Sequence, residues 1–73
     1  MNIRKNLFQA LELKYKAKQQ EAKTNLDILF ESHVGVADHP NMVDTMDDLL
    51  KKYAEASELL TTLQENFSEF TQD

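Results

Sequence analysis

The segment MVDTMDDLLKKYAEASELLTTLQENFSEF, residues 42–70, carries the most regular hydrophobic pattern in this chain of 73 residues. Apolar or aromatic residues recur in it at alternating steps of four and three, which is the spacing of a continuous stripe along an α-helix. A half-buried strand would alternate at every second residue instead. We therefore predict a long helix with a seam formed by Met42, Met46, Leu49, Tyr53, Ala56, Leu60, Leu63, Phe67 and Phe70.

The first half of the chain repeats this pattern less regularly. Phe8, Leu11 and Tyr15 have helical spacing, but a polar stretch through Lys18 follows before apolar residues resume. We expect a second long helix whose seam passes through at least one stutter. Its later seam residues are Ala22, Leu26, Leu29 and His33.

Gly35 and Pro40, the only glycine and the only proline, lie between these two patterns. Glycine suits the position just past a helix C-terminus, and proline suits the first turn of the next helix. The sequence therefore predicts one domain and an all-α fold. A helix over residues 2–33, a turn over 34–40 and a helix over 41–71 would form an antiparallel, coiled-coil-like hairpin.

An antiparallel hairpin pairs seam residues whose numbers add up to a constant, and a sum of about 75 aligns the two stripes. This register sets small Ala22 opposite large Tyr53, as interdigitated layers require. It also brings bases of the first helix near acids of the second, where each exposed pair is worth about 0–1 kcal/mol. The expected pairs join Lys14 and Lys18 to Glu55 and Glu58, and Arg4 and Lys5 to Glu69 and Asp73.

A chain this short builds a core worth on the order of 3–5 kcal/mol, so small proteins usually add disulfides, a metal or a second copy of themselves. This chain has no cysteine. Several apolar residues also fall off the predicted seams, where a lone hairpin would leave them in water. We expect a homo-oligomer, most simply a dimer of hairpins that forms a four-helix bundle. The candidate interface residues are Ile28, Phe30, Val43, Leu50 and Leu59.

The net charge of −5 is unevenly distributed along the chain. Residues 1–34 carry six bases and four acids, a net charge of +2, whereas residues 35–73 carry two bases and nine acids, a net charge of −7. A protein that binds nucleic acid without sequence preference needs clustered lysine and arginine, so we predict no nucleic-acid partner. The acidic half leaves an alternative function open: an inhibitor or decoy that occupies a basic, nucleic-acid-binding surface of another protein.

No apolar run approaches the roughly 18 residues of a membrane span, and the first residues lack the apolar stretch of a signal peptide. We therefore expect a cytoplasmic protein without a membrane partner.

The region around the turn holds the only residues worth testing as metal ligands. No histidine pair has i, i+4 spacing, and no Glu-x-x-His motif of the di-metal bundles occurs. The chain also lacks a cysteine nucleophile and a glycine-rich phosphate loop. We predict no metal, no cofactor and no enzymatic activity, but a small interaction or structural accessory protein that acts through helical surfaces. The residues weighed as ligands are Glu31, His33, Asp38, His39, Asp44, Asp47 and Asp48.

The segment Val34-Gly35-Val36-Ala37-Asp38-His39-Pro40 is followed by an acidic amphipathic helix. In this respect the chain resembles small uncharacterised helical-hairpin proteins of tailed phages, including phages of marine cyanobacteria, in which a similar segment joins two helices. The resemblance covers most of the chain, from about Leu11 through Phe67. It implies a viral accessory or structural protein in the host cytoplasm, and it carries no functional site over to this sequence.

Overall fold

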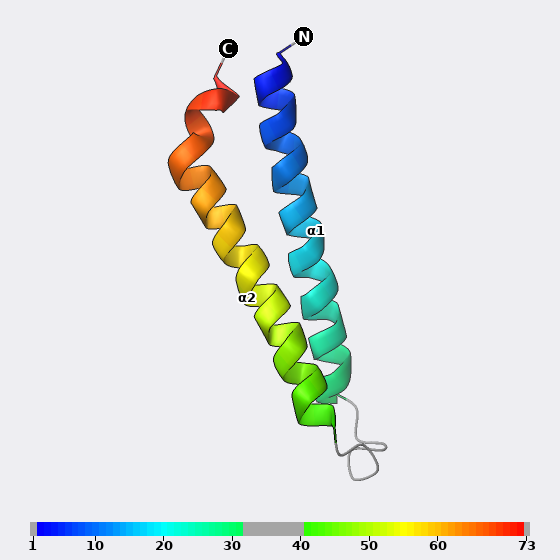
Figure 1. The fold of residues 1–73 in the computed structure, drawn as a ribbon. Helices are drawn as coiled ribbons and strands as arrows, with labels where there is room; N and C mark the ends of the chain where they lie inside the picture. Colours follow the sequence, from blue (N-terminus) through cyan, green and yellow to red (C-terminus); the bar gives the residue numbers. More distant parts are fainter. Residues whose placement is uncertain (1, 32–40, 73) are drawn as a thin grey trace.

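A computed structural model describes residues 2–31 and 41–72, which form two α-helices and a short 3-10 helix. Helix α1 covers Ile3–Glu31, helix α2 covers Met42–Phe67, and the 3-10 helix η1 covers Ser68–Thr71. The two long helices lie side by side in opposite directions, with both chain termini at one end of a body of 55 × 19 × 13 Å (Figure 1). The predicted all-α helical hairpin is confirmed. The predicted turn, residues 34–40, lies outside the described residues.

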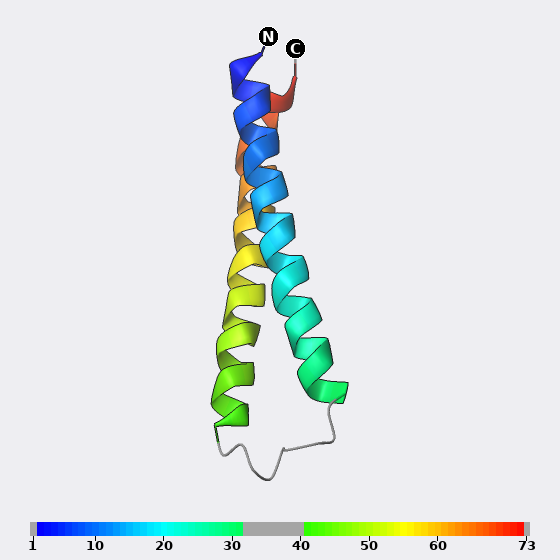
Figure 2. The ribbon, with the colours of Figure 1, turned by 90° about the vertical axis from the view of Figure 1, so that its right-hand side faces the viewer.

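The axes of the two antiparallel helices are inclined to each other, so the helices cross. Figure 2 shows one helix behind the other near the termini and the two helices apart at the opposite end. A shallow crossing of this kind is the geometry in which seam side chains of two long helices interdigitate.

The two long helices begin differently. Asn2 caps α1, because its side-chain Oδ1 accepts a hydrogen bond of 3.1 Å from the backbone N–H of Lys5. Such a bond satisfies one of the N–H groups that the first helical turn leaves without a partner. Asn41 precedes α2 without a side-chain cap, and its carbonyl oxygen accepts the backbone N–H of Thr45 at 2.9 Å.

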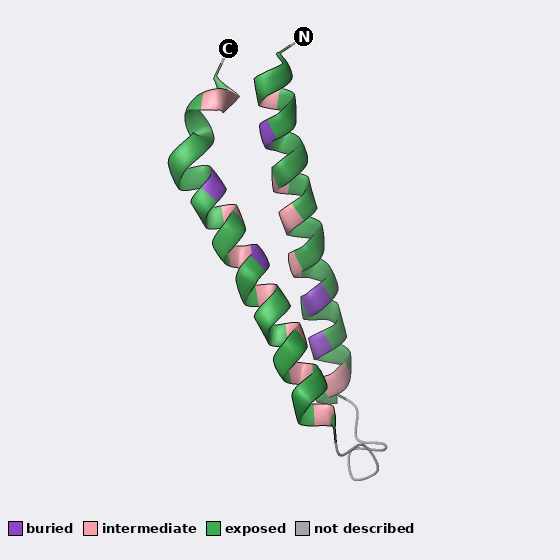
Figure 3. Ribbon diagram, viewed as in Figure 1, coloured by how far each residue is buried: buried purple, intermediate pink, exposed green. Residues whose placement is uncertain are grey.

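The predicted seam of α2 faces α1, as the buried and half-buried segments of Figure 3 show. Ala56 and Leu63 are buried, with 2% and 8% of their surface exposed. Of the other seven predicted seam residues, only Phe67 is exposed, and six are half-buried: Met42, Met46, Leu49, Tyr53, Leu60 and Phe70. The prediction of a heptad seam in this helix is therefore confirmed up to Leu63.

The predicted stutter in α1 is wrong, because the inward-facing residues of this helix keep the heptad spacing without a break. The seam passes through Glu12, which is half-buried, and not through its apolar neighbour Leu11, which is exposed. Polar residues thus occupy regular seam positions, and a search for apolar residues alone overlooks them. The seam of α1 consists of Lys5, Phe8, Glu12, Tyr15, Gln19, Ala22, Leu26 and Leu29.

Contacts between the helices confirm the predicted register to within about one residue. The side-chain amide of Gln19 donates a hydrogen bond of 2.9 Å to Ser57 Oγ, and the two positions add up to 76. The amide of Gln64 donates a bond of 3.0 Å to Glu12, with the same sum. The part-buried bond between Gln19 and Ser57 satisfies polar groups at the seam that would otherwise lose their water partners.

The ion pairs expected of Lys14 and Lys18 do not form, whereas the pairing expected at Asp73 lies outside the described residues. Lys14 and Lys18 make no ion pair with Glu55 or Glu58, all four of which lie in the described part of the chain. The ion pairs found among the described residues join side chains four apart on one helix: Lys23 with Asp27 at 2.8 Å and Lys51 with Asp47 at 3.0 Å. Neighbours at i, i+4 already share a helix face, so pairing them orders less chain than pairing across the hairpin.

Helix α2 ends at Phe67, whereas the sequence predicts a helix that continues to residue 71. The hydroxyl of Ser68 donates a hydrogen bond of 2.6 Å to the carbonyl oxygen of Gln64. A serine that bonds back in this way competes with the helical pattern and bends the chain. The tighter turn of η1 then brings Phe70 beside Phe67, with ring centroids 6.5 Å apart, and under the guanidinium of Arg4 at 5.8 Å.

Candidate interaction surfaces

The five predicted interface residues are all exposed. The largest exposed fractions belong to Val43 at 75% and Phe30 at 71%, and the smallest belongs to Leu59 at 37%. They belong to a wider group of exposed large apolar residues that also includes Ile3, Leu7, Leu11, Leu13 and Phe67.

These five residues do not share one stripe of the hairpin. Successive residues of an α-helix are about 100° apart, so residues directly after and directly before a seam position lie on opposite flanks of the seam. Phe30, Val43 and Leu50 directly follow seam residues, whereas Ile28 and Leu59 directly precede them. The hairpin therefore offers two separate sides.

The first side carries an apolar notch of about 240 Å³ near the ends of the helices that are far from the chain termini. Phe30 borders it from α1, and Val43 and Leu50 border it from α2. Its floor is made by seam residues, and the one charged group in its lining is the carboxylate of Asp47, which pairs with Lys51. The notch consists of Leu26, Phe30, Val43, Met46, Asp47 and Leu50.

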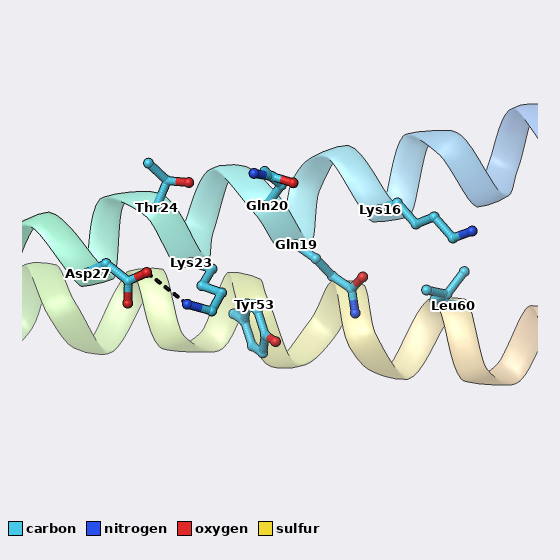
Figure 4. A pocket seen from close by; sticks show the side chains of 8 residues that line it. All are labelled: Lys16, Gln19, Gln20, Lys23, Thr24, Asp27, Tyr53 and Leu60. Atoms are coloured by element: carbon cyan, nitrogen blue, oxygen red, sulfur yellow. Dashed lines mark hydrogen bonds and ion pairs between the residues drawn. The ribbon is translucent and has the colours of Figure 1, made fainter.

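A larger, mostly polar hollow of about 640 Å³ lies further along the same side (Figure 4). Lys23 Nζ donates a hydrogen bond of 2.8 Å to Asp27 there, and this bond, followed by the charge of the carboxylate, raises the pKa of Lys23. Figure 4 shows Gln19 of α1 extending between Tyr53 and Leu60 of α2. The hollow thus presents amide and ammonium groups rather than a nucleophile held by a base.

The opposite side carries a charged groove of about 340 Å³ at mid-length of the hairpin. Its floor includes Ala22 and Ala56, one from each helix, and both are buried. Two lysines and two glutamates border the groove, and none of them forms an ion pair with a described residue. The groove is lined by Lys18, Glu21, Ala22, Asn25, Leu49, Lys52, Glu55, Ala56 and Leu59.

Sequence reasoning missed this groove although the chain contains a signal for it. The pattern Lys-x-x-Glu-Ala occurs at residues 18–22 and again at residues 52–56, once in each helix. Each alanine occupies a seam position, so the antiparallel register brings the two copies together across the seam. A search for short repeats at matching seam positions would have found it.

The residues weighed as metal ligands are only partly described. His33, Asp38 and His39 lie outside the described residues, whereas Glu31, Asp44 and Asp48 are exposed on the helices. Residues 2–31 and 41–72 contain no group of three His, Cys, Asp or Glu side chains that could hold a metal ion. Neither long helix, as described, combines the length and the apolar character needed to cross a membrane.

Comparison with protein-family models, with curated proteins and with solved structures gives no match to this chain. The resemblance to phage hairpin proteins therefore stays a prediction from the segment at residues 34–40.

Proposed function

We propose that this chain is a small, non-enzymatic interaction protein that self-associates through its helical surfaces, most simply as a dimer of hairpins in a four-helix bundle. The observation that carries this proposal is the balance between core and exposed apolar surface. Among the described residues five apolar side chains are buried, whereas ten large apolar side chains are exposed. Apolar surface gains free energy when it leaves water, so these side chains favour contact with a second surface.

The accessible surface supports the same proposal. The chain exposes 5853 Å², which is about 1,200 Å² more than a compact monomer of this mass would expose. A stable protein–protein interface buries about 800 Å² on each partner. A second copy could therefore cover a standard interface and still leave each hairpin more exposed than a compact monomer of this mass.

Light scattering after gel filtration tests this proposal. Across a series from low to high micromolar protein, we expect the molar mass to rise from that of one chain to that of two. A mass that stays at one chain at the highest concentration would overturn self-association.

A second candidate function, an acidic inhibitor or decoy of a basic surface, is favoured by the acids of α2. Asp44, Glu58 and Glu65 recur at seven-residue multiples along one side of the helix, where they are exposed and form no ion pair with a described residue. Lys51 occupies the same repeat between Asp44 and Glu58 but pairs with Asp47, so the row keeps a net negative charge. Such a charge attracts a basic partner over distances of about the Debye length, roughly 8 Å at physiological salt.

Binding of a labelled oligolysine peptide, measured by fluorescence anisotropy at low and high salt, tests the decoy function. We expect affinity to fall with salt and to fall further in Glu58→Gln/Glu65→Gln than in the matched control Glu21→Gln/Glu31→Gln on α1. Equal losses in both variants, or binding that salt does not weaken, would contradict a specific role for α2.

The sequence also suggests a viral accessory protein of the host cytoplasm, because of the segment at residues 34–40, and we extend the proposal to that setting. Fractionation of cells that express the chain from its native source is the direct test. Recovery in the membrane or extracellular fraction would overturn it.

A further inference from the structure

The charged groove is bordered by two lysines and two glutamates, so its charges are balanced. Lys18 and Glu21 border it from α1, and Lys52 and Glu55 border it from α2. None of these four groups forms an ion pair with any described residue. On the other side of the hairpin, Lys23 pairs with Asp27 and Lys51 pairs with Asp47 within their own helices, whereas Lys16 forms no ion pair with a described residue.

We propose that the charged groove is the surface on which a second copy of this chain docks, with lysines of one groove set against glutamates of the other. This inference rests on the proposed self-association and assigns it to one of the two sides of the hairpin.

The order of the charges supports a second copy as the occupant. On both helices a lysine precedes a glutamate by three residues, at Lys18 and Glu21 and at Lys52 and Glu55. When two such pairs meet in antiparallel helices, the lysine of each faces the glutamate of the other. The match arises when α1 of the second copy lies antiparallel over α1 of the first, and a two-fold dimer repeats each contact.

The floor and rim of the groove suit close approach of another helix. Ala22 and Ala56 carry the smallest side chains of the seam and leave room above them. Leu59 borders the groove, and Ile28 lies in an adjoining hollow of about 450 Å³ that shares Asn25 and Lys52 with it. Docking would therefore bury apolar side chains beside the charge contacts, which resembles the apolar centre and polar rim of ordinary interfaces.

Complementary charge reversal tests the assignment. Lys18→Glu/Lys52→Glu makes all four groove charges negative, and Glu21→Lys/Glu55→Lys makes all four positive. Because like charges would then face each other, we expect each variant alone to weaken self-association at least about a hundredfold. An equimolar mixture of the two variants should restore the two-chain mass in light scattering, since opposite charges meet again.

Two matched controls separate the groove from general effects. Lys16→Glu/Lys51→Glu makes the same change in net charge away from the groove and should dimerise like the wild type. Leu59→Lys should weaken the dimer, whereas Leu50→Lys, which changes a leucine of the apolar notch, should not. Circular dichroism should show unchanged helix content, because all of these side chains except that of Leu59 are well exposed.

The outcomes distinguish this inference from the function on which it rests. A wild type that stays monomeric would overturn both the proposed self-association and its assignment to the charged groove. A wild-type dimer that survives both groove reversals, or that Leu50→Lys disrupts while Leu59→Lys does not, would place the contact elsewhere and leave the proposed function standing. Failure of the mixture to restore the dimer, or equal weakening by the charge control, would overturn the lysine–glutamate contacts.

Discussion

Helices α1 and α2 contribute to one seam at the same spacing but with different chemistry. Every seam position of α2 is apolar or aromatic, whereas α1 places Lys5, Glu12 and Gln19 at intervals of seven. Polar groups at such positions usually cost stability and restrict register, because their hydrogen bonds are satisfied in only one alignment. The difference suggests that α2 supplies most of the apolar attraction of the hairpin, while α1 specifies how the two helices align.

A charge introduced into the apolar seam of α2 should have the largest effect on stability. Leu63→Asp should destabilise the protein by roughly 3–5 kcal/mol, since a buried carboxylate has no partner there. The control Leu13→Asp, at an exposed position off the seam, should change stability by under about 0.5 kcal/mol. Urea unfolding followed by circular dichroism, at one protein concentration because self-association adds stability, would compare them. Equal unfolding midpoints would contradict the seam.

Replacing a polar seam residue of α1 by an apolar residue should change stability in the opposite direction and should raise it. Gln19→Leu should stabilise the hairpin by about 1 kcal/mol, because apolar burial at the seam outweighs one hydrogen bond to half-buried Ser57. Double-label distance measurements should show a broader distribution between the helices if Gln19 helps to specify register. The exposed neighbour Gln20→Leu provides the control and should leave that distribution narrow. A loss of stability in Gln19→Leu would mean that the hydrogen bond dominates.

The cation over the aromatic ring at the termini should have a smaller effect. Arg4→Gln removes the guanidinium that lies 5.8 Å from the ring centroid of Phe70. We expect a loss of about 0.5–1 kcal/mol, typical of such contacts at exposed sites. Thermal unfolding of Arg4→Gln beside Phe70→Leu and the double variant would measure the coupling. Fully additive losses would show that the two side chains do not interact.

The ion pair within α1 should have the smallest effect on the fold. Asp27→Asn should lower the pKa of Lys23 back toward the ordinary lysine value of 10.5, since the hydrogen bond and charge of Asp27 raise it. A raised lysine pKa means that the pair contributes below about pH 10.5 and that its contribution is lost as the pH rises through the raised pKa. NMR titration of the lysine side chains would measure this, with Lys51, still paired to Asp47, as the internal control. If the pKa of Lys23 did not change, Asp27 would not be the group that raises it.

The two sides of the hairpin show which parts of an interaction surface can be predicted from sequence. The exposure of Phe30 and Leu59 follows from their positions off the heptad seam. The side of the hairpin on which each residue lies depends on whether the residue follows or precedes a seam position. With the correct seam of α1, the sequence would have placed the two residues on opposite sides. The seam of α1 was misassigned at Leu11 and Glu12, because an apolar residue beside a polar one is the natural choice when no partner helix is visible.

The sequence by itself determined that this chain forms two long helices in an antiparallel hairpin, and it determined their register, because an apolar repeat of this length has one alignment that buries it. Only the tertiary structure decided that Glu12 and Gln19 belong to the seam, since their hydrogen-bond partners Gln64 and Ser57 lie on the other helix. It also decided that lysines and glutamates far apart in the chain border one groove. Local spacing specifies a helix face, but residues of two helices become neighbours only when the chain has folded.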